Sequence, residues 1–169
     1  VCIMPLIYCG KCYFCRRGLN HLCLYQGATG LQWHWGGFAD YCLAKEYQLN
    51  RLPDNVPYEV GALIEPAALA LYAIDQGGVK PGDTIFIAGG GPTAVLTLMA
   101  AQGAGAAAVY MSEVAAGRLK RLKDFGATEV FNPAQVNLVE EVRRRTGGVG
   151  ADVTIDCTGV QSAITDCLK

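Results

Sequence analysis

Residues 84–94 read TIFIAGGGPTA, an apolar run that ends in three glycines and a proline. The apolar part predicts a buried β-strand over 84–88, and the almost wholly apolar stretch that follows predicts a helix over 93–102. The same alternation continues downstream, with strands expected over 107–111, 129–131 and 151–157 and helices over 114–125, 136–146 and from 162 onward. This rhythm predicts an α/β fold, a doubly wound parallel sheet with helices on both faces.

The glycines after the first strand fit the pattern G-x-G-x-x-G/A, with Gly89, Gly91 and Ala94 at its fixed positions. Between a strand and a helix, this pattern predicts a site for the pyrophosphate of a dinucleotide. Pro92 and Thr93 open the helix, whose free N–H groups and positive dipole end favour phosphate.

An acidic residue follows the second predicted strand, about 20 residues after the glycines, at Glu113. A carboxylate there can accept hydrogen bonds from both adenosine ribose hydroxyls and repels a 2′-phosphate, so it predicts NAD rather than NADP. We expect Arg118, one turn into the next helix, to border the adenine or to be solvated.

Four cysteines, Cys9, Cys12, Cys15 and Cys23, have the spacing C-x2-C-x2-C-x7-C. Four thiolates suit a tetrahedral Zn²⁺ and leave no open coordination position, so the spacing favours a structural zinc site. Two disulfides or free thiols, and an iron–sulfur cluster, remain alternatives, although the x3-C-P continuation typical of ferredoxins is missing. His21 lies within this segment, and we expect it to be a surface or neighbouring residue rather than a ligand.

The composition narrows the possible functions. The chain has 169 residues, 14 basic and 15 acidic, which gives no electrostatic case for binding nucleic acid or an anionic membrane. No apolar run reaches the roughly 20 residues that a membrane helix needs. Five of the eight cysteines lie in the first 23 residues, which favours a metal cluster in a reducing, cytoplasmic setting over a secreted disulfide scaffold.

The cysteine segment resembles the structural zinc lobe of the zinc-containing medium-chain alcohol dehydrogenases. The sequences IYCGKC (7–12), GLNHLC (18–23) and GLQWHWGGFADY (30–41) are similar to the polyol branch of that family. The resemblance runs over essentially the whole chain. It implies part of a mostly β, GroES-like catalytic domain over 1–75 and the first part of a dinucleotide-binding (Rossmann) domain over 76–169, an internal fragment of a longer enzyme.

Glu65 is a single carboxylate in the apolar stretch Gly61–Ala67, so we expect it to have a partner. From the residues alone, it can equally be a helix N-terminal carboxylate. The resemblance implies that Glu65 lies at a catalytic zinc, as a ligand or one water away. It also implies that a Cys and a His–Glu pair, the remaining ligands, precede Val1. We expect His34 to pack or to lie at a pocket rim.

The loop after the fourth strand reads Asp156-Cys157-Thr158-Gly159. The resemblance makes Thr158 and Gly159 neighbours of the cofactor, and Cys157 is expected to be a small core residue. The arginine run 143–145 is expected to be a solvated helix end.

The combined expectation is a parent enzyme that uses zinc and NAD to interconvert a secondary alcohol of a small diol or polyol and its ketone. Butanediol is the first choice of substrate, and sorbitol and L-threonine are alternatives. The relatives imply a homodimer or homotetramer. The rival from another class is a catalytically inactive, zinc-stabilised NAD-binding fragment, and this chain alone is expected to be inactive.

Overall fold

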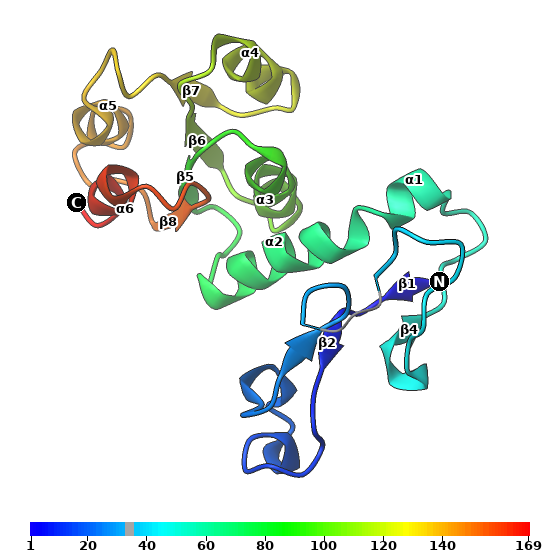
Figure 1. Cartoon of the computed structure of the whole chain (residues 1–169). Helices are drawn as coiled ribbons and strands as arrows, with labels where there is room; N and C mark the ends of the chain where they lie inside the picture. Colours follow the sequence, from blue (N-terminus) through cyan, green and yellow to red (C-terminus); the bar gives the residue numbers. More distant parts are fainter. Residues whose placement is uncertain (33–35) are drawn as a thin grey trace. The chain divides into compact units, whose positions relative to one another are not determined.

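The computed structural model describes residues 1–32 and 36–169, and the chain divides into two compact units, Val1–Glu65 and Pro66–Lys169 (Figure 1). The sequence-based boundary, between residues 75 and 76, falls instead at the end of helix α2 (Ile64–Gln76). The helix belongs with the second unit because its Ile74 is buried in that unit's core. His34 lies outside the described residues, so its role stays a prediction.

The second unit is built on four parallel strands, as the sequence predicts. They are β5 (Thr84–Ala88), β6 (Ala108–Ser112), β7 (Glu129–Phe131) and β8 (Val153–Asp156), in the order β7-β6-β5-β8. The chain first builds outward from β5 through β6 to β7 and then returns to the other side of β5. The sheet order therefore reverses between β5 and β8, the point at which open α/β sheets bind their ligands.

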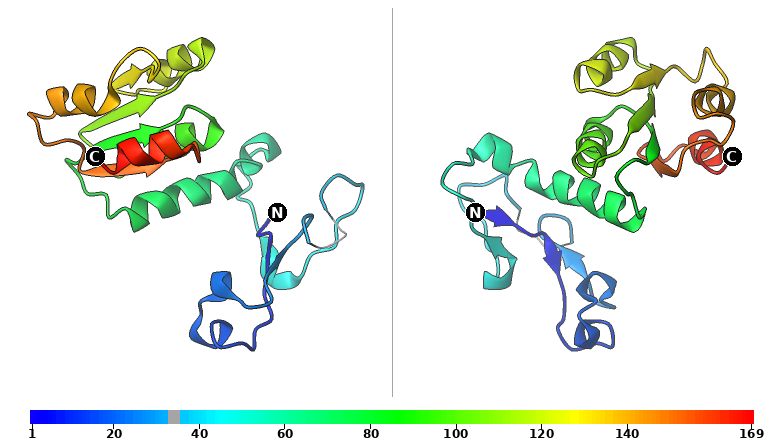
Figure 2. Two further views of the ribbon diagram at one scale, coloured as in Figure 1. Left: turned by 60° about the vertical axis from the view of Figure 1, so that its left-hand side comes forward. Right: turned by 180° about the vertical axis from the view of Figure 1, so that it is seen from behind.

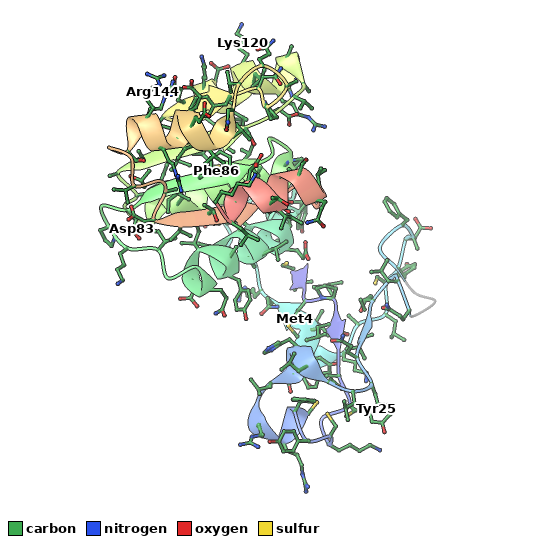
Figure 3. The ribbon with its side chains drawn as sticks, turned by 90° about the vertical axis from the view of Figure 1, so that its left-hand side faces the viewer. Met4, Tyr25, Asp83, Phe86, Lys120 and Arg144 are labelled. Carbon is green, nitrogen blue, oxygen red and sulfur yellow. The ribbon has the colours of Figure 1, made fainter. Side chains whose placement is uncertain are left out.

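Helices cover both faces of this sheet, with α5 and α6 on one side and α3 and α4 on the other (Figures 1 and 2). They are α3 (Pro92–Gly103), α4 (Ala116–Asp124), α5 (Leu138–Arg145) and α6 (Gln161–Cys167). Because strand side chains alternate, β5 serves both cores. Ile85 and Ile87 pack in the core beneath α3 and α4, which we call the first core. Phe86 packs in the second core, beneath α5 and α6. Figure 3 shows Phe86 inside the unit, whereas Lys120 and Arg144 project outward.

The arginine run at the end of α5 is only partly a solvated helix end, and that expectation is wrong for Arg145. Its side chain is 19% exposed and forms ion pairs with Glu129 of β7 and with Glu141. The guanidinium also lies over the Phe131 ring, 4.7 Å from its centroid. Arg145 therefore fastens α5 to the edge strand of the sheet.

The first unit contains short strands joined by turns. Strand β1 (Cys2–Ile3) pairs antiparallel with β4 (Leu49–Asn50), and β2 (Leu6–Ile7) pairs with β3 (Gly27–Ala28). The helical turns are η1 (Cys15–Arg17), η2 (Asn20–Leu22), η3 (Glu46–Gln48) and the short helix α1 (Tyr58–Gly61). Regular strand is thus sparse in the part of this unit that the structure describes, although the sequence predicts a mostly β domain.

A buried amide ties the strands of the first unit together. Gln48 is 1% exposed, and its Nε2 donates to the Met4 carbonyl at 2.9 Å and to Thr29 Oγ1 at 3.0 Å. Its Oε1 accepts from the backbone N–H of Lys45. A buried amide with its partners made stabilises the connection, because an unpaired one is costly. Among the described helices, none has the length and apolar character needed to cross a bilayer.

Candidate functional site

The four predicted cysteines come together at one point, in a segment that we call the zinc lobe (residues 9–23). Their Sγ atoms lie within 4.8 Å of one another. The Sγ–Sγ distance is 3.5 Å for Cys12–Cys15 and 4.0 Å for both Cys9–Cys15 and Cys12–Cys23. The helical turn η1 carries Cys15, and Cys23 directly follows η2. The two-residue gaps and the turned lobe thus bring all four sulfurs round one centre.

These distances fit a single tetrahedral zinc ion. With a Zn–S bond of about 2.3 Å, the edge of a ZnS4 tetrahedron is about 3.8 Å. A disulfide needs an S–S distance of about 2.05 Å, and all eight cysteines are free. An iron–sulfur cluster would hold the cysteine sulfurs further apart than one ion does. The geometry therefore favours zinc over disulfides and over an iron–sulfur cluster, and four protein ligands would leave no position for a substrate.

Backbone donors and burial set the ionisation of the thiols. The N–H groups of Cys12 and Tyr25 donate to Cys9 Sγ and Cys23 Sγ, each at 3.3 Å. The backbone N–H groups of Cys15 and Leu24 lower the pKa of Cys12 to about 6. Burial and the neighbouring thiols raise the pKa of Cys15 to about 12. A divalent metal at this centre would supply positive charge that favours the thiolate form of its ligands.

His21 does not join this ligand set. It is the middle residue of η2 and is exposed, and the described cluster contains only the four cysteines. The prediction that His21 is a surface or neighbouring residue is confirmed for the structure described.

The glycine turn between β5 and α3 needs glycine for a different reason at each position. Gly89 has φ +105°, and a Cβ on it would lie 3.0 Å from Thr158 Cγ2. A Cβ on Gly90 would lie 2.7 Å from Glu113 Oε2. A Cβ on Gly91 would meet no described atom within 4 Å, so its backbone is open to a ligand. Gly91 caps α3, Pro92 and Thr93 form its first turn, and the buried Ala94 lets the helix pack on the sheet.

Glu113 follows β6 and is 7% exposed. Its Oε1 accepts from the backbone N–H groups of Val114 at 2.7 Å and Ala115 at 2.9 Å. Its Oε2 lies 3.5 Å from Nη1 of Arg118. Burial raises the pKa of Glu113, but the Ala115 and Val114 amides and Arg118 outweigh it and hold the pKa below its usual value. Glu113 is thus a buried carboxylate anchored beside the glycine turn. Arg118 is its ion-pair partner rather than only a solvated side chain.

The loop after β8 is organised by Asp156, a residue that no sequence motif indicated as part of a site. Its Oδ1 accepts from the Thr158 hydroxyl at 2.6 Å and from the Thr158 N–H at 3.0 Å. Its Oδ2 accepts from the Gly159 N–H at 2.9 Å, and Gly159 has φ +67°. Cys157 is partly buried against the first core, as predicted. The nearby Thr–Gly pair was a visible signal for a turn-capping carboxylate.

A cleft of about 410 Å³ lies at the carboxyl ends of the strands, a size in the range of ligand pockets. Five of the predicted cofactor residues line it, namely Gly89, Gly91, Glu113, Arg118 and Thr158, whereas Pro92, Thr93 and Gly159 do not. Residues that the sequence did not indicate complete its walls, among them Gly90, Pro133, Val160 and Ser162. The structure therefore assembles a single cleft from the glycine turn and the loops on its two sides.

A second hollow of about 310 Å³ lies between α5 and α6. Its lining includes Gly150, Ala151 and Asp152, which precede β8. It thus reaches toward the amino ends of the strands, away from the edge where such sheets bind ligands.

Glu65 lies in the first turn of α2 and is exposed. Its carboxylate forms no hydrogen bond or ion pair with any other residue that the structure describes, so the expected partner is not found there. The described part of the chain holds no second group of three or more metal-ligating side chains. The position matches the helix N-terminal alternative, and the catalytic-zinc role of Glu65 stays a prediction.

Comparison with known families matches both units of the chain. The family described as "Alcohol dehydrogenase GroES-like domain" matches residues 1–54, and that described as "Zinc-binding dehydrogenase" matches residues 92–169. The chain belongs to the zinc-containing alcohol dehydrogenases. The GroES-like match contains the zinc lobe, and the zinc-binding dehydrogenase match contains most of the residues that line the cleft.

Individual zinc-containing alcohol dehydrogenases are similar over nearly the whole chain. The (R,R)-butanediol dehydrogenase of Bacillus subtilis is 36% identical over 90% of the chain and 44% of its own length. The probable D-xylulose reductase A of Aspergillus fumigatus is 32% identical over 97% of the chain and 47% of its own length. The chain thus spans about half the length of the curated relatives it matches.

A solved structure of 34% sequence identity has the same fold. The structure of a putative zinc-binding dehydrogenase from Sinorhizobium meliloti, bound to NADP, has a TM-score of 0.88 and 34% identity. The match covers 96% of this chain and 49% of that one. The GroES-like and Rossmann-like fold class that the sequence predicts is confirmed.

Proposed function

We propose that this chain is part of a zinc- and NAD-dependent dehydrogenase that interconverts a secondary alcohol of a small diol or polyol and its ketone. The observation that carries the proposal is the pairing of a closed four-cysteine zinc lobe with a dinucleotide cleft that contains a buried acid. Relatives named for butanediol and for D-xylulose support the substrate class. When bound, NAD would supply hydride transfer to or from the alcohol carbon, and a catalytic zinc would supply polarisation of the alcohol oxygen.

The choice of NAD rests on Glu113. Its carboxylate is fixed by two backbone amides that favour the ionised form, and its Oε2 lies beside the glycine turn. A fixed negative charge at this point favours a ribose with free hydroxyls and disfavours a 2′-phosphate. The NADP-bound relative makes this a point to test directly. Arg118 offsets part of the charge, but its side chain is 58% exposed and therefore screened by water.

The four cysteines would hold a structural zinc that closes residues 9–23 into one lobe. Glu65 is proposed as the residue of this chain at the catalytic zinc, on the strength of the family resemblance. Butanediol is the first choice of substrate, with sorbitol and L-threonine next. We also propose a cytoplasmic location, where a reducing environment preserves thiolates, and assembly of the longer protein into a dimer or tetramer.

One observation favours the rival proposal for the chain as it stands. Glu65 is exposed, and no described residue joins it in a metal site. A zinc-stabilised, NAD-binding fragment without turnover accounts for this as well. The two proposals differ in zinc content and in rate, because a dehydrogenase needs a catalytic zinc in addition to the structural one.

The first test measures zinc per chain and the binding of NADH and NADPH to the 169-residue protein. We expect one zinc per chain, tighter binding of NADH than of NADPH, and no turnover. Cys12→Ser should abolish zinc retention, and Glu113→Ala should weaken NADH and reduce the preference over NADPH. Absence of NADH binding by the zinc-loaded wild-type protein would refute the proposal. Turnover of the longest protein that its gene encodes, assayed with 2,3-butanediol, sorbitol and L-threonine, then separates enzyme from remnant.

A further inference from the structure

We propose that Asp156 is a positioning residue for the adenosine end of the dinucleotide, a role that rests on the proposed NAD binding. Asp156 does not itself line the cleft. It holds the loop 157–160 in the conformation that makes this loop a wall of the cleft.

The register places Asp156 directly beside the glycine turn. Ala88, the last residue of β5, pairs with Ser112 of β6 on one side and with Asp156 of β8 on the other. The ladder continues past the strand ends, since Gly89 N–H donates to the Ser112 carbonyl and Cys157 N–H donates to the Ala88 carbonyl, each at 2.9 Å. The loops that follow β6 and β8 therefore begin at the same level, on either side of the turn.

Asp156 uses both carboxylate oxygens on its own loop. Oδ1 accepts from the hydroxyl and the N–H of Thr158, and Oδ2 accepts from the N–H of Gly159. Hydrogen bonds to an ionised carboxylate are stronger than bonds between neutral groups. These three hydrogen bonds fix the direction in which the chain leaves β8. One of them holds Gly159, whose φ is +67°.

The loop held in this way lines the cleft with three residues, Cys157, Thr158 and Val160. The Thr158 hydroxyl, which donates to Asp156, also accepts from the Val160 N–H at 3.0 Å. Thr158 and Val160 line the same cleft as Glu113. Thr158 also packs so closely on the turn that a Cβ on Gly89 would lie 3.0 Å from its Cγ2. Movement of this loop would therefore change the shape of the cleft beside the glycine turn.

The adenosine end is the part of the dinucleotide concerned, because Glu113 shares the cleft with this loop. A carboxylate in the position of Glu113 recognises the hydroxyls of the adenosine ribose. A loop that completes the same cleft from the other side of β5 must then border the same half of the ligand. AMP, which contains only that half, is the appropriate probe.

The chain offers a matched control in Asp152, four residues earlier and just before β8. Its Oδ2 accepts from the Thr84 N–H at 2.8 Å, and it lies among the residues of the other hollow, not of the cleft. Asp152 and Asp156 are thus two carboxylates that accept backbone hydrogen bonds at opposite ends of one strand. Removing either costs stability, but only Asp156 is expected to affect the ligand.

The test compares AMP affinity, by calorimetry on the zinc-loaded 169-residue protein, for wild type, Asp156→Ala, Asp156→Asn and Asp152→Ala. Thermal unfolding and zinc content are measured for each. We expect Asp156→Ala to weaken AMP binding about tenfold, equivalent to about 1.4 kcal/mol, and Asp156→Asn, which keeps an acceptor for Thr158, to weaken it by roughly threefold. Asp152→Ala should bind AMP within about twofold of wild type, because its hydrogen bond lies away from the cleft.

The following outcomes would contradict the inference. Wild-type affinity in Asp156→Asn, together with either wild-type affinity or failure to fold in Asp156→Ala, would overturn it. An equal loss of affinity in Asp152→Ala would show that AMP binding follows overall stability instead. If the wild-type protein bound neither AMP nor NADH, the proposed function itself would fail, and the inference with it.

Discussion

Gly90 and Gly91 are neighbours in one turn, yet the structure predicts opposite responses to a single added methyl group. A Cβ on Gly90 would lie 2.7 Å from Glu113 Oε2 and 2.9 Å from Cδ1 of Leu122. Leu122 is fully buried and Glu113 is anchored by two backbone amides, so neither can move freely. A Cβ on Gly91 would meet no described atom, and the backbone there has φ −76°, which any residue can adopt.

The expected magnitudes follow from these distances. Overpacking a tight core costs about 1–3 kcal/mol, so Gly90→Ala should lower the unfolding free energy by that amount. For a chain of 169 residues, the midpoint of thermal unfolding should fall by roughly 2–12 °C. Gly91→Ala loses some helix-capping preference but restricts the unfolded chain, and the two effects leave stability within about 0.5 kcal/mol of wild type. Its methyl group nevertheless occupies the space in which a pyrophosphate would approach the backbone.

The assay is urea unfolding followed by circular dichroism, combined with NADH titration of each folded variant. Gly90→Ala should be destabilised, and Gly91→Ala should be as stable as wild type but bind NADH at least about tenfold more weakly. Equal stability of wild type and Gly90→Ala would refute the packing argument. Tight NADH binding by Gly91→Ala would refute the placement of the phosphates at this turn.

Two further predictions concern ion pairs. Arg145→Met should lower the unfolding free energy by about 1–2 kcal/mol. The loss is smaller than for a fully buried pair because water still reaches Glu129. Arg144→Met, at a more exposed position, serves as the control. Glu113 has a pKa in the folded state below its ordinary value. Its carboxylate therefore contributes fully to the free energy of unfolding above the unfolded-state pKa, and this contribution is lost as the pH falls through the folded-state pKa. The stability gap between wild type and Glu113→Gln, about 1 kcal/mol at pH 7, should therefore shrink in urea titrations below about pH 4.5, and a constant gap would contradict this.

The sheet could be predicted from the sequence because its signals are local. Each strand is a short apolar run, and the observed strand β5 has the predicted bounds. Gly89, Gly91 and Glu113 belong to a pattern whose spacing is set by one strand–turn–helix unit and the next strand. The cysteine spacing acts within one short segment in the same way.

The rest depends on contacts between distant segments. Gly90 occupies a variable position of the glycine pattern, and glycine is needed there only because β6 places Glu113 beside it. Asp156 gains its role from pairing with Ala88. Arg145 could have been found, since it lies three residues after the buried Val142 and seven after the buried Leu138, on one face of α5. The run of three arginines hid that periodicity.

The two candidate sites differ in the sequence separation of the residues that form them. The first and last cysteines of the zinc lobe are 14 residues apart, and the loop between them closes within one segment. The cleft, in contrast, exists only after Ala88 has paired with both Ser112 and Asp156. Local contacts form faster than distant ones. During refolding, metal uptake should therefore report the early closure of the zinc lobe, and nucleotide binding should report the later assembly of the sheet. The two ligands would thus follow two different stages in the folding of one chain.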